Sequence, residues 1–214
     1  MPRLTPALVS LCLAAAVVSA AAPPAADTNA PPATAPATRR ALFDGKSLAG
    51  WRPIGKGEWR VEDGAIVGRH AKAEKDYGHL LSEESFTDFT IRLQFKAVRG
   101  NSGLYFRIAE KGSSGVTGFQ AEIDAKVDVG GLYETNGRSW VVQPKPADVA
   151  KYFKPGEWNE MVVCAHGTKV TVDVNGVRTA DIDDARQRMA GPFALQVHGG
   201  QDGEVWFKDI EIRP

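Results

Sequence analysis

Three polar side chains, Gln120, Glu122 and Asp124, alternate with apolar residues in a predicted strand over residues 119–124. Alternate residues of a strand point the same way and lie about 6–7 Å apart at Cα. Two carboxyls at that distance can share a small substrate, and one raises the pKa of the other, which prepares an acid beside a base. The alternative is a solvated strand face with ordinary surface carboxylates. Pattern alone favours that alternative.

Two other predicted strands carry side chains that suit the same kind of chemistry. Arg107, on one strand face with Tyr105, has a fixed fork of donors that stabilises developing negative charge. A histidine such as His198 suits an acid or a base near neutral pH, and Gln196 shares its strand face and suits the orientation of substrate hydroxyls. The plainer alternatives stay open: Arg107 pairs with a carboxylate across the sheet, and His198 only shapes the turn at Gly199.

The interval 125–157 is poor in strand pattern, and Trp140 lies within it. Long irregular loops on a β scaffold usually border a binding face. Trp140 is therefore predicted to lie at a binding face, whereas Trp59 and Trp158 open strands after Gly-Glu and are predicted to pack. The remaining histidines have no motif around them and are interpreted as surface or structural residues: His70, His79 and His166.

Alternation of apolar and polar residues at period two dominates the predicted elements. Asn175-Gly176 predicts a type I′ hairpin turn, and Leu104, Phe106 and Ile108 are expected to share one strand face. Helical periodicity is confined to residues 147–152 and 183–189. Many short strands separated by turns predict an all-β sandwich or barrel. Strands are expected at residues 89–97, 103–108, 119–124, 158–165, 169–174, 177–181, 192–198 and 205–212.

Short motifs follow one another along the chain at Leu42–Leu48, Gly50-Trp51, Asn101–Arg107, Gly118–Asp124, Gly131–Tyr133, Gly156–Asn159, Val174–Gly176 and Gly191–Gly199. In this order they resemble the 3-keto-disaccharide hydrolase domain family, long classed as a domain of unknown function. The resemblance covers about residues 42–214. It implies an all-β, two-sheet antiparallel jelly-roll sandwich of the concanavalin A-like lectin/glucanase type. One departure is that family members commonly have an acid where this chain has Gln120, and a glutamine where it has Glu122.

The resemblance also implies a chemistry and a carbohydrate substrate. A ketone at C3 of a sugar acidifies the proton on C2, so that a base removes it, the C1 substituent leaves, and water adds back. We expect Glu122 to be the base with Asp124 as its partner, Arg107 to stabilise the enolate, and His198 to act as acid or base. Gln120, Gln196, Trp140 and Tyr105 are expected to bind substrate.

Two alternatives to this enzyme stay open, a lectin-like carbohydrate-binding module and an exported structural or adhesion domain. The exchanged residues at positions 120 and 122 also suit a lectin-like module that binds carbohydrate without cleaving it. Glu122-Ile123-Asp124 matches the start of the glucanase motif Glu-x-Asp-x-x-Glu, but Val127 stands where the last Glu belongs. A standard retaining glucanase mechanism is therefore not expected.

No cofactor is expected. Glu122, Asp124 and His198 are residue types that bind a divalent cation, but no local ligand spacing supports a metal site. The sequence also has no phosphate-binding glycine loop, Ser-His-Asp arrangement or Cys-x-x-Cys motif.

The first 40 residues predict export. Residues 1–22 have one early arginine, a short apolar run and an alanine-rich end, which is typical of a cleaved signal peptide. Residues 23–40 are rich in Ala, Pro and Thr and predict a tether, leaving residues 41–214 as one exported, periplasmic or extracellular domain. The chain has 26 basic and 26 acidic residues, a balance that favours neither nucleic acid nor a membrane surface as partner. Cys164, the only cysteine after Cys12, is predicted to be a buried inert thiol; the oligomeric state is left open.

Overall fold

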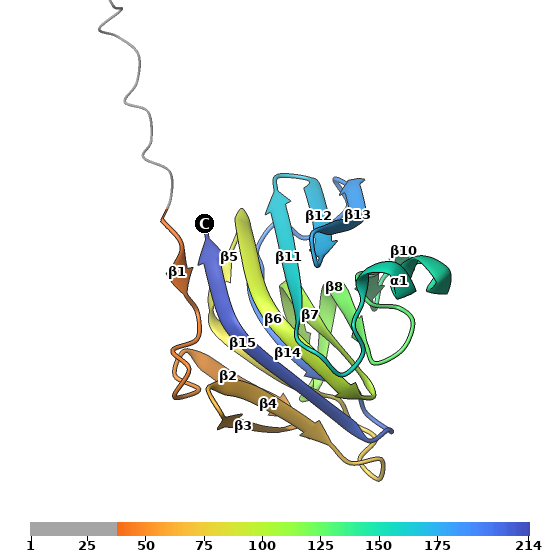
Figure 1. Cartoon of the computed structure of the whole chain (residues 1–214). Helices are drawn as coiled ribbons and strands as arrows, with labels where there is room; N and C mark the ends of the chain where they lie inside the picture. Colours follow the sequence, from red (N-terminus) through yellow and green to blue (C-terminus); the bar gives the residue numbers. More distant parts are fainter. Residues whose placement is uncertain (1–37) are drawn as a thin grey trace, which may run out of the picture. The chain divides into compact units, whose positions relative to one another are not determined.

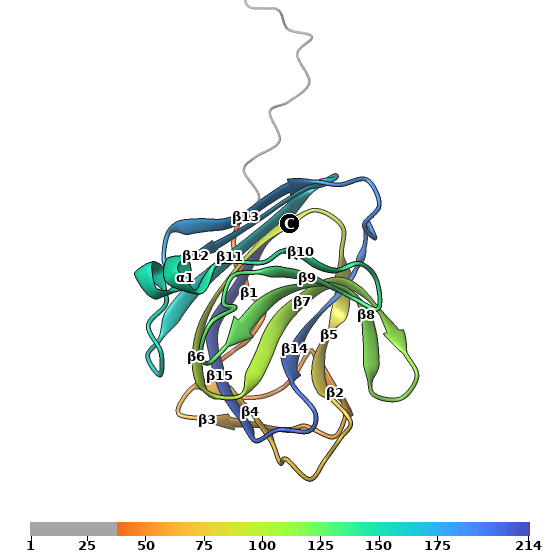
Figure 2. The same cartoon turned by 90° about the vertical axis from the view of Figure 1, so that its right-hand side faces the viewer.

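A computed structural model of the chain describes residues 38–214 as two antiparallel sheets that face each other across a common core (Figures 1 and 2). We name the sheet that carries the cavity described below the site sheet, and the other the backing sheet. The site sheet has the order β10-β9-β8-β7-β14-β5-β2. Its strands are β2 (Trp51–Gly55), β5 (Gly78–Phe86), β7 (Asn101–Lys111), β8 (Gly115–Asp124), β9 (Leu132–Thr135), β10 (Ser139–Val142) and β14 (Gly191–Val197).

The backing sheet has the order β13-β12-β11-β6-β15-β4-β3, and β1 pairs with β15 at one side. Its strands are β1 (Arg40–Ala41), β3 (Glu58–Glu62), β4 (Ala65–His70), β6 (Phe89–Arg99), β11 (Asn159–His166), β12 (Lys169–Val174), β13 (Val177–Asp183) and β15 (Gly203–Arg213). The predicted all-β, two-sheet sandwich is confirmed. Within residues 38–214, no helix has the length and apolar character needed to cross a membrane.

Alternation within the strands separates the core from the two outer faces. In β6, Phe89, Ile91, Leu93 and Phe95 are buried between the sheets, while the residues between them are partly exposed. The β12–β13 turn confirms the hairpin prediction, because Asn175 (φ 49°) and Gly176 (φ 79°) both have the positive φ of a type I′ turn.

The interval 125–157 was expected to be a long irregular loop, and that expectation is wrong. It contains the hairpin strands β9 and β10 and the helix α1 (Pro146–Tyr152), which lies near one end of the backing sheet (Figure 1). The helix confirms the prediction at residues 147–152 and buries Val149 and Tyr152. The second predicted helix, at 183–189, is absent, because β13 continues to Asp183 and a turn follows it.

A β-bulge in β7 changes which residues share a face. Pairing with β8 shifts register between Phe106 and Ala109, and Arg107 has φ 49°. Leu104 and Phe106 belong to the core between the sheets, but Ile108 packs with Tyr105 in a separate cluster. The expected common face of Leu104, Phe106 and Ile108 is therefore wrong, and Arg107 and Tyr105 point to different places.

Arg107 is 2% exposed and joins three segments that are distant in sequence. Its Nε donates to the carbonyl of Thr87 at 2.7 Å, and its Nη1 donates to the carbonyl of Gly167 at 2.8 Å and to Gln187 Oε1 at 3.0 Å. Its Nη2 lies 3.1 Å from a carboxylate oxygen of Asp88. The guanidinium is thus occupied in holding turns together.

Cys164 and Arg40 also differ from their predicted surroundings. Cys164 is partly exposed, not buried, and Thr90 Oγ1 lies 3.7 Å from its sulfur.

The predicted signal peptide and nearly all of the predicted tether lie outside the described residues. Arg40, at the predicted end of the tether, begins β1 and pairs with Ile212.

Replacing Arg107 with lysine is expected to lower the free energy of unfolding by about 2–3 kcal/mol, because one ammonium cannot reach all four acceptors and leaves some of them unpaired. Denaturant unfolding of Arg107→Lys measures this, with the exposed Arg188→Lys as the matched control. Equal stability of the two variants would contradict the structural role.

Candidate functional site

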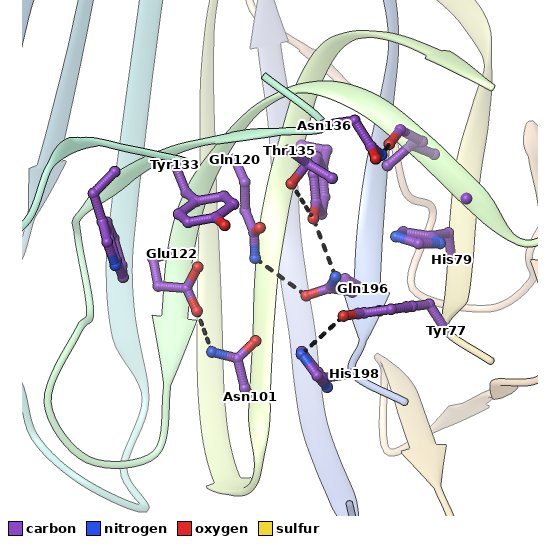
Figure 3. Close-up of a pocket in the computed structure, with 14 residues that line it drawn as sticks. Tyr77, His79, Asn101, Gln120, Glu122, Tyr133, Thr135, Asn136, Gln196 and His198 are labelled. Atoms are coloured by element: carbon purple, nitrogen blue, oxygen red, sulfur yellow. Dashed lines mark hydrogen bonds between the residues drawn. The ribbon is translucent and has the colours of Figure 1, made fainter. Parts of the chain in front are cut away.

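A cavity of about 460 Å³ opens on the face of the site sheet that points away from the core (Figure 3). The residues that form it come from β5, β7, β8, β9, β10 and β14, together with the β9–β10 turn and the loops that precede β5 and follow β14. The lining residues are Tyr77, His79, Asn101, Tyr105, Gly115, Val116, Gln120, Glu122, Tyr133, Thr135, Asn136, Trp140, Gln196 and His198.

Glu122 is the one carboxylate among these lining residues, and it is 4% exposed. Burial raises the pKa of Glu122 to about 8, since the charged form loses its hydration. The side-chain amide of Asn101, which donates to Oε1, lowers that pKa, while the charges of Asp124 and Asp128 add to the rise. A carboxyl with a pKa near 8 is protonated for most of the time at neutral pH.

A chain of hydrogen bonds crosses the floor of the cavity from β8 to β9 (Figure 3). Gln120 Nε2 donates to the carbonyl of Ser102 at 3.0 Å and to Gln196 Oε1 at 3.1 Å. A carbonyl only accepts, so Ser102 determines which end of the Gln120 amide faces it, and Gln120 in turn orients Gln196. Gln196 Nε2 then donates to the hydroxyl of Tyr105 at 3.1 Å, and Tyr105 lies 2.9 Å from Thr135 Oγ1.

Gly103 makes this chain of hydrogen bonds sterically feasible. The strand β7 lies between β8 and β14, so Gln120 must reach across β7 to meet Gln196. A Cβ at Gly103 would lie 2.3 Å from Gln120 Nε2, which is too close for two non-bonded atoms. The glycine therefore leaves the space that the amide occupies.

Tyr77 and His198 form a second hydrogen-bonded pair on another wall. His198 Nδ1 lies 2.7 Å from the carbonyl of Gly199, which only accepts, so Nδ1 carries a proton. In the neutral ring Nε2 is then an acceptor, and it receives the hydroxyl proton of Tyr77 across 3.1 Å. Burial raises the pKa of Tyr77, which keeps this hydroxyl protonated.

His79 also points into the cavity. Its Nδ1 lies 3.0 Å from the carbonyl of Ser114, and its Nε2 is buried without a partner among residues 38–214. Burial lowers the pKa of His79 to about 4; the bond to Ser114 opposes this shift and the nearby His198 adds to it. The imidazole is therefore neutral at physiological pH.

Two aromatic rings close the side of the cavity near Glu122. Tyr133 and Trp140 are paired across β9 and β10, with ring centroids 5.2 Å apart and planes at 88°. A Cβ at Gly131 would lie 2.7 Å from the Trp140 ring, so glycine is needed for the indole to lie where it does. Aromatic rings at a polar cavity suit the C–H faces of a sugar.

Six of the predicted site residues line the cavity: Tyr105, Gln120, Glu122, Trp140, Gln196 and His198. Arg107 does not, because the bulge in β7 turns it toward the structural contacts described above. Asp124 does not either; its Oδ1 accepts from the backbone N–H groups of Lys126 at 2.6 Å and Val127 at 3.0 Å, which closes the turn after β8. Asp124 therefore affects Glu122 only through its negative charge, which adds to the rise in the pKa of Glu122.

Sequence reasoning missed several lining residues, among them Tyr77, His79, Asn101, Tyr133 and Thr135. Asn101 and Tyr133 lie within the motifs quoted above, and that was a usable signal. Nothing in the residues around His79 distinguishes it from a structural histidine, because its partner Ser114 is 35 positions away. Between residues 38 and 214, no group of three His, Cys, Asp or Glu side chains is placed to hold a metal ion.

The raised pKa of Glu122 predicts a pH dependence of stability. Between the ordinary value of 4.5 and the folded value of about 8, the unfolded chain loses the Glu122 proton while the folded protein keeps it. Stability is therefore greatest below pH 4.5 for this group and falls as pH rises, by at most about 1.4 kcal/mol per pH unit. Glu122→Gln should remove this slope in urea unfolding measured from pH 5 to 8, and an unchanged slope would contradict the burial argument.

Restoring an acid at position 120 is expected to disrupt the floor of the cavity. Glu in place of Gln120 faces the Ser102 carbonyl and Gln196 Oε1 with acceptors only, so Gln120→Glu should lose about 1–3 kcal/mol of stability at pH 7. The loss should shrink at low pH, where the new carboxyl is protonated and donates one hydrogen bond. Gln94→Glu, a partly exposed position opposite Lys208, is the matched control, and equal losses in both would contradict this reading.

Comparisons with known proteins agree with this geometry. A model of the 3-keto-alpha-glucoside-1,2-lyase-like domain family matches residues 38–213. A 3-keto-disaccharide hydrolase of Bacteroides thetaiotaomicron is 33% identical over 78 residues, which cover 32% of this chain and 27% of that protein. The match thus spans less than a third of the relative's length.

Two solved structures share the fold. A carbohydrate-binding module from Bacillus subtilis aligns over 82% of this chain and 100% of that one, with TM-score 0.61 and 21% identity. A protein of unknown function with a galectin-like fold, also from Bacillus subtilis, aligns over 82% of this chain and 94% of that one, with TM-score 0.64 and 14% identity. At these identities the likeness shows a lectin-like sandwich and nothing more specific.

Proposed function

We propose that this chain, which belongs to the 3-keto-alpha-glucoside-1,2-lyase-like family, cleaves 3-keto-glycosides in the cavity of its site sheet. The observation that carries the proposal is Glu122, a buried carboxyl whose pKa of about 8 lies close to neutral pH. General bases and acids work best when their pKa is near the working pH.

Glu122 is the base in this proposal. Its Oε1 is held by Asn101, which leaves Oε2 for the proton on C2 of a 3-keto sugar. About one tenth of the carboxyl is ionised at pH 7, and the ionised fraction is a stronger base than an ordinary glutamate. Asn101 thus orients the base.

Neutral groups stabilise the enolate. Of residues 38–214, those that line the cavity include no lysine or arginine, so the role first assigned to Arg107 passes to uncharged donors. Asn101 Nδ2 and Gln196 Nε2 each have a second hydrogen besides the one already donated. Such preorganised donors in a site shielded from water stabilise developing oxyanion charge.

The Tyr77–His198 pair is placed to serve the leaving group. β8 and β14 are separated by β7, so the two strands lie about 9–10 Å apart, and His198 follows β14 two residues beyond Gln196, the residue directly across from Glu122. This separation leaves room for one sugar ring. We assign the proton for the departing oxygen to the Tyr77 hydroxyl or to a protonated His198 Nε2.

The proposed reaction is an elimination followed by addition of water. Glu122 takes the proton from C2, and the electrons of that bond form the C2=C3 double bond of an enolate. The enolate returns its electrons to form C1=C2, the C1–O bond breaks, and the departing oxygen takes a proton from the Tyr77–His198 pair. Water then adds its hydroxyl to C1 and gives its remaining proton to the Tyr77–His198 pair, and Glu122 returns its proton to C2, which completes net hydrolysis and restores both groups.

A binding module without catalysis is the second candidate. The observation in its favour is the neutral chain of hydrogen bonds through Gln120, Gln196, Tyr105 and Thr135, since uncharged donors and acceptors suit sugar hydroxyls whether or not a bond is broken. In either case we propose that the domain acts outside the cytoplasm, on the strength of the signal-like pattern in residues 1–22.

The full-length chain without its first 22 residues should release product from 3-keto-trehalose and 3-keto-glucosides but not from the unoxidised glycosides, because only the ketone acidifies C2. The rate constant kcat/KM should rise with pH and level off above about pH 8, where Glu122 is ionised. Glu122→Gln should lower kcat by at least about 100-fold, since general base catalysis contributes about that much.

Asp124→Asn is the matched control, because it removes a nearby carboxylate that does not line the cavity. It should lower the pKa read from the pH profile and leave most of the activity. Sugar binding by calorimetry without turnover of any keto substrate would favour the binding module instead.

A further inference from the structure

His79 presents an acceptor that the protein itself does not use. The side chain is 2% exposed, and Nε2 is buried without a partner among the described residues. Buried polar atoms are nearly always hydrogen-bonded, and leaving one unpaired costs about 1–3 kcal/mol. An unpaired acceptor on the wall of a cavity therefore points to a ligand that supplies the missing donor.

The backbone determines what kind of partner His79 requires. The Ser114 carbonyl, 3.0 Å from Nδ1, only accepts, so the ring proton is on Nδ1 and Nε2 has a lone pair. The lowered pKa of His79, to about 4, keeps the ring from gaining a second proton near neutral pH. Nε2 is thus an acceptor throughout the physiological range.

The two aromatic rings beside His79 do not donate a hydrogen bond to its Nε2. Tyr77 lies nearly parallel to the imidazole with ring centroids 6.1 Å apart, and Tyr105 lies edge-on at 5.5 Å. The hydroxyl of Tyr77 is bonded to His198, and that of Tyr105 to Gln196 and Thr135. Figure 3 shows His79 on the opposite side of the cavity from Glu122.

We propose that His79 is a specificity-determining residue: its Nε2 accepts a hydrogen bond from a hydroxyl group of the bound sugar, at the end of the cavity away from Glu122. This inference rests on the proposed carbohydrate function. It adds an orientation, because a carbonyl oxygen cannot donate to Nε2. The ketone of a 3-keto sugar therefore does not pair with Nε2 of His79, and it faces the side-chain amide donors of Asn101 or Gln196 instead.

Two variants test the acceptor at Nε2 of His79 independently of the donor at Nδ1. In His79→Asn the amide nitrogen takes the place of Nδ1 and still donates to Ser114, but nothing replaces Nε2. In His79→Gln the amide oxygen reaches the place of Nε2 and keeps an acceptor there. Stability of both variants is measured by urea unfolding, so that a loss of folding is distinguished from a loss of binding.

The probes are methyl 3-keto-α-glucoside and analogues in which the hydroxyl at C2, C4 or C6 is replaced by fluorine, which cannot donate. Their binding is measured by calorimetry with the Glu122→Gln protein, in which turnover is suppressed. One analogue should bind at least about tenfold more weakly than the parent sugar. His79→Asn should weaken binding of the parent sugar by a similar factor. In this variant the fluorinated analogue should bind as tightly as the parent sugar, because the acceptor is already gone. His79→Gln should recover part of the affinity for the parent sugar.

In turnover assays with Glu122 intact, His79→Asn should raise KM and change kcat little, since the hydrogen bond is present before and during the reaction. A merely structural histidine would not couple to one hydroxyl position. Turnover without such coupling leaves the proposed function standing and overturns the role of His79. Coupled binding without turnover supports that role and overturns catalysis.

NMR of the ring nitrogens provides a test that needs no sugar. The His79 Nδ1 should carry the proton and Nε2 should be unprotonated from pH 5.5 to 8, and addition of the sugar should shift Nε2 most. A proton on Nε2 in the free protein would overturn the inference regardless of the activity. Absence of binding by every probe would overturn both this inference and the proposed function.

Discussion

Three backbone carbonyls set the polarity of the whole cavity, because a carbonyl accepts hydrogen bonds and never donates them. Ser102 determines the orientation of the Gln120 amide, Ser114 determines which nitrogen of His79 carries the proton, and Gly199 does the same for His198. These carbonyls belong to β7 or to turns that the sandwich holds in place, so the fold itself decides which side-chain atoms face a ligand as donors and which as acceptors.

Burial shifts the pKa values of Glu122 and His79 in opposite directions, and both side chains are mostly uncharged at neutral pH. The pKa of Glu122 rises to about 8 and that of His79 falls to about 4, since loss of hydration disfavours the charged form of either group. At neutral pH the Glu122 carboxyl is therefore mostly protonated and the His79 imidazole is neutral. Uncharged groups of this kind suit an uncharged ligand, and Glu122 ionises as the pH rises toward 8.

The sequence predicted eight strands from period-two alternation, a local property, and five of the six cavity residues that it identified lie on those strands. Arg107 and His79 were misplaced for the converse reason. The bulge that turns Arg107 away from the cavity needs only a positive φ at one residue, which no alternation pattern reveals, and its acceptors lie 20, 60 and 80 positions away. His79 owes its role to a carbonyl in another turn. Long-range contacts of this kind have no signature in the neighbouring residues.

The Asn101-Ser102-Gly103 segment shows why an acid at position 122 is compatible with glutamine at 120. Position 120 faces two acceptors, the Ser102 carbonyl and Gln196 Oε1, and so requires a donor that passes through the gap left by Gly103. Position 122 faces the donor Asn101 and so tolerates a carboxylate. Of the two positions, only 122 therefore offers a carboxyl a hydrogen-bond donor that opposes the effect of burial. The donors and acceptors on β7 and β14 match a glutamine at 120 and a glutamate at 122.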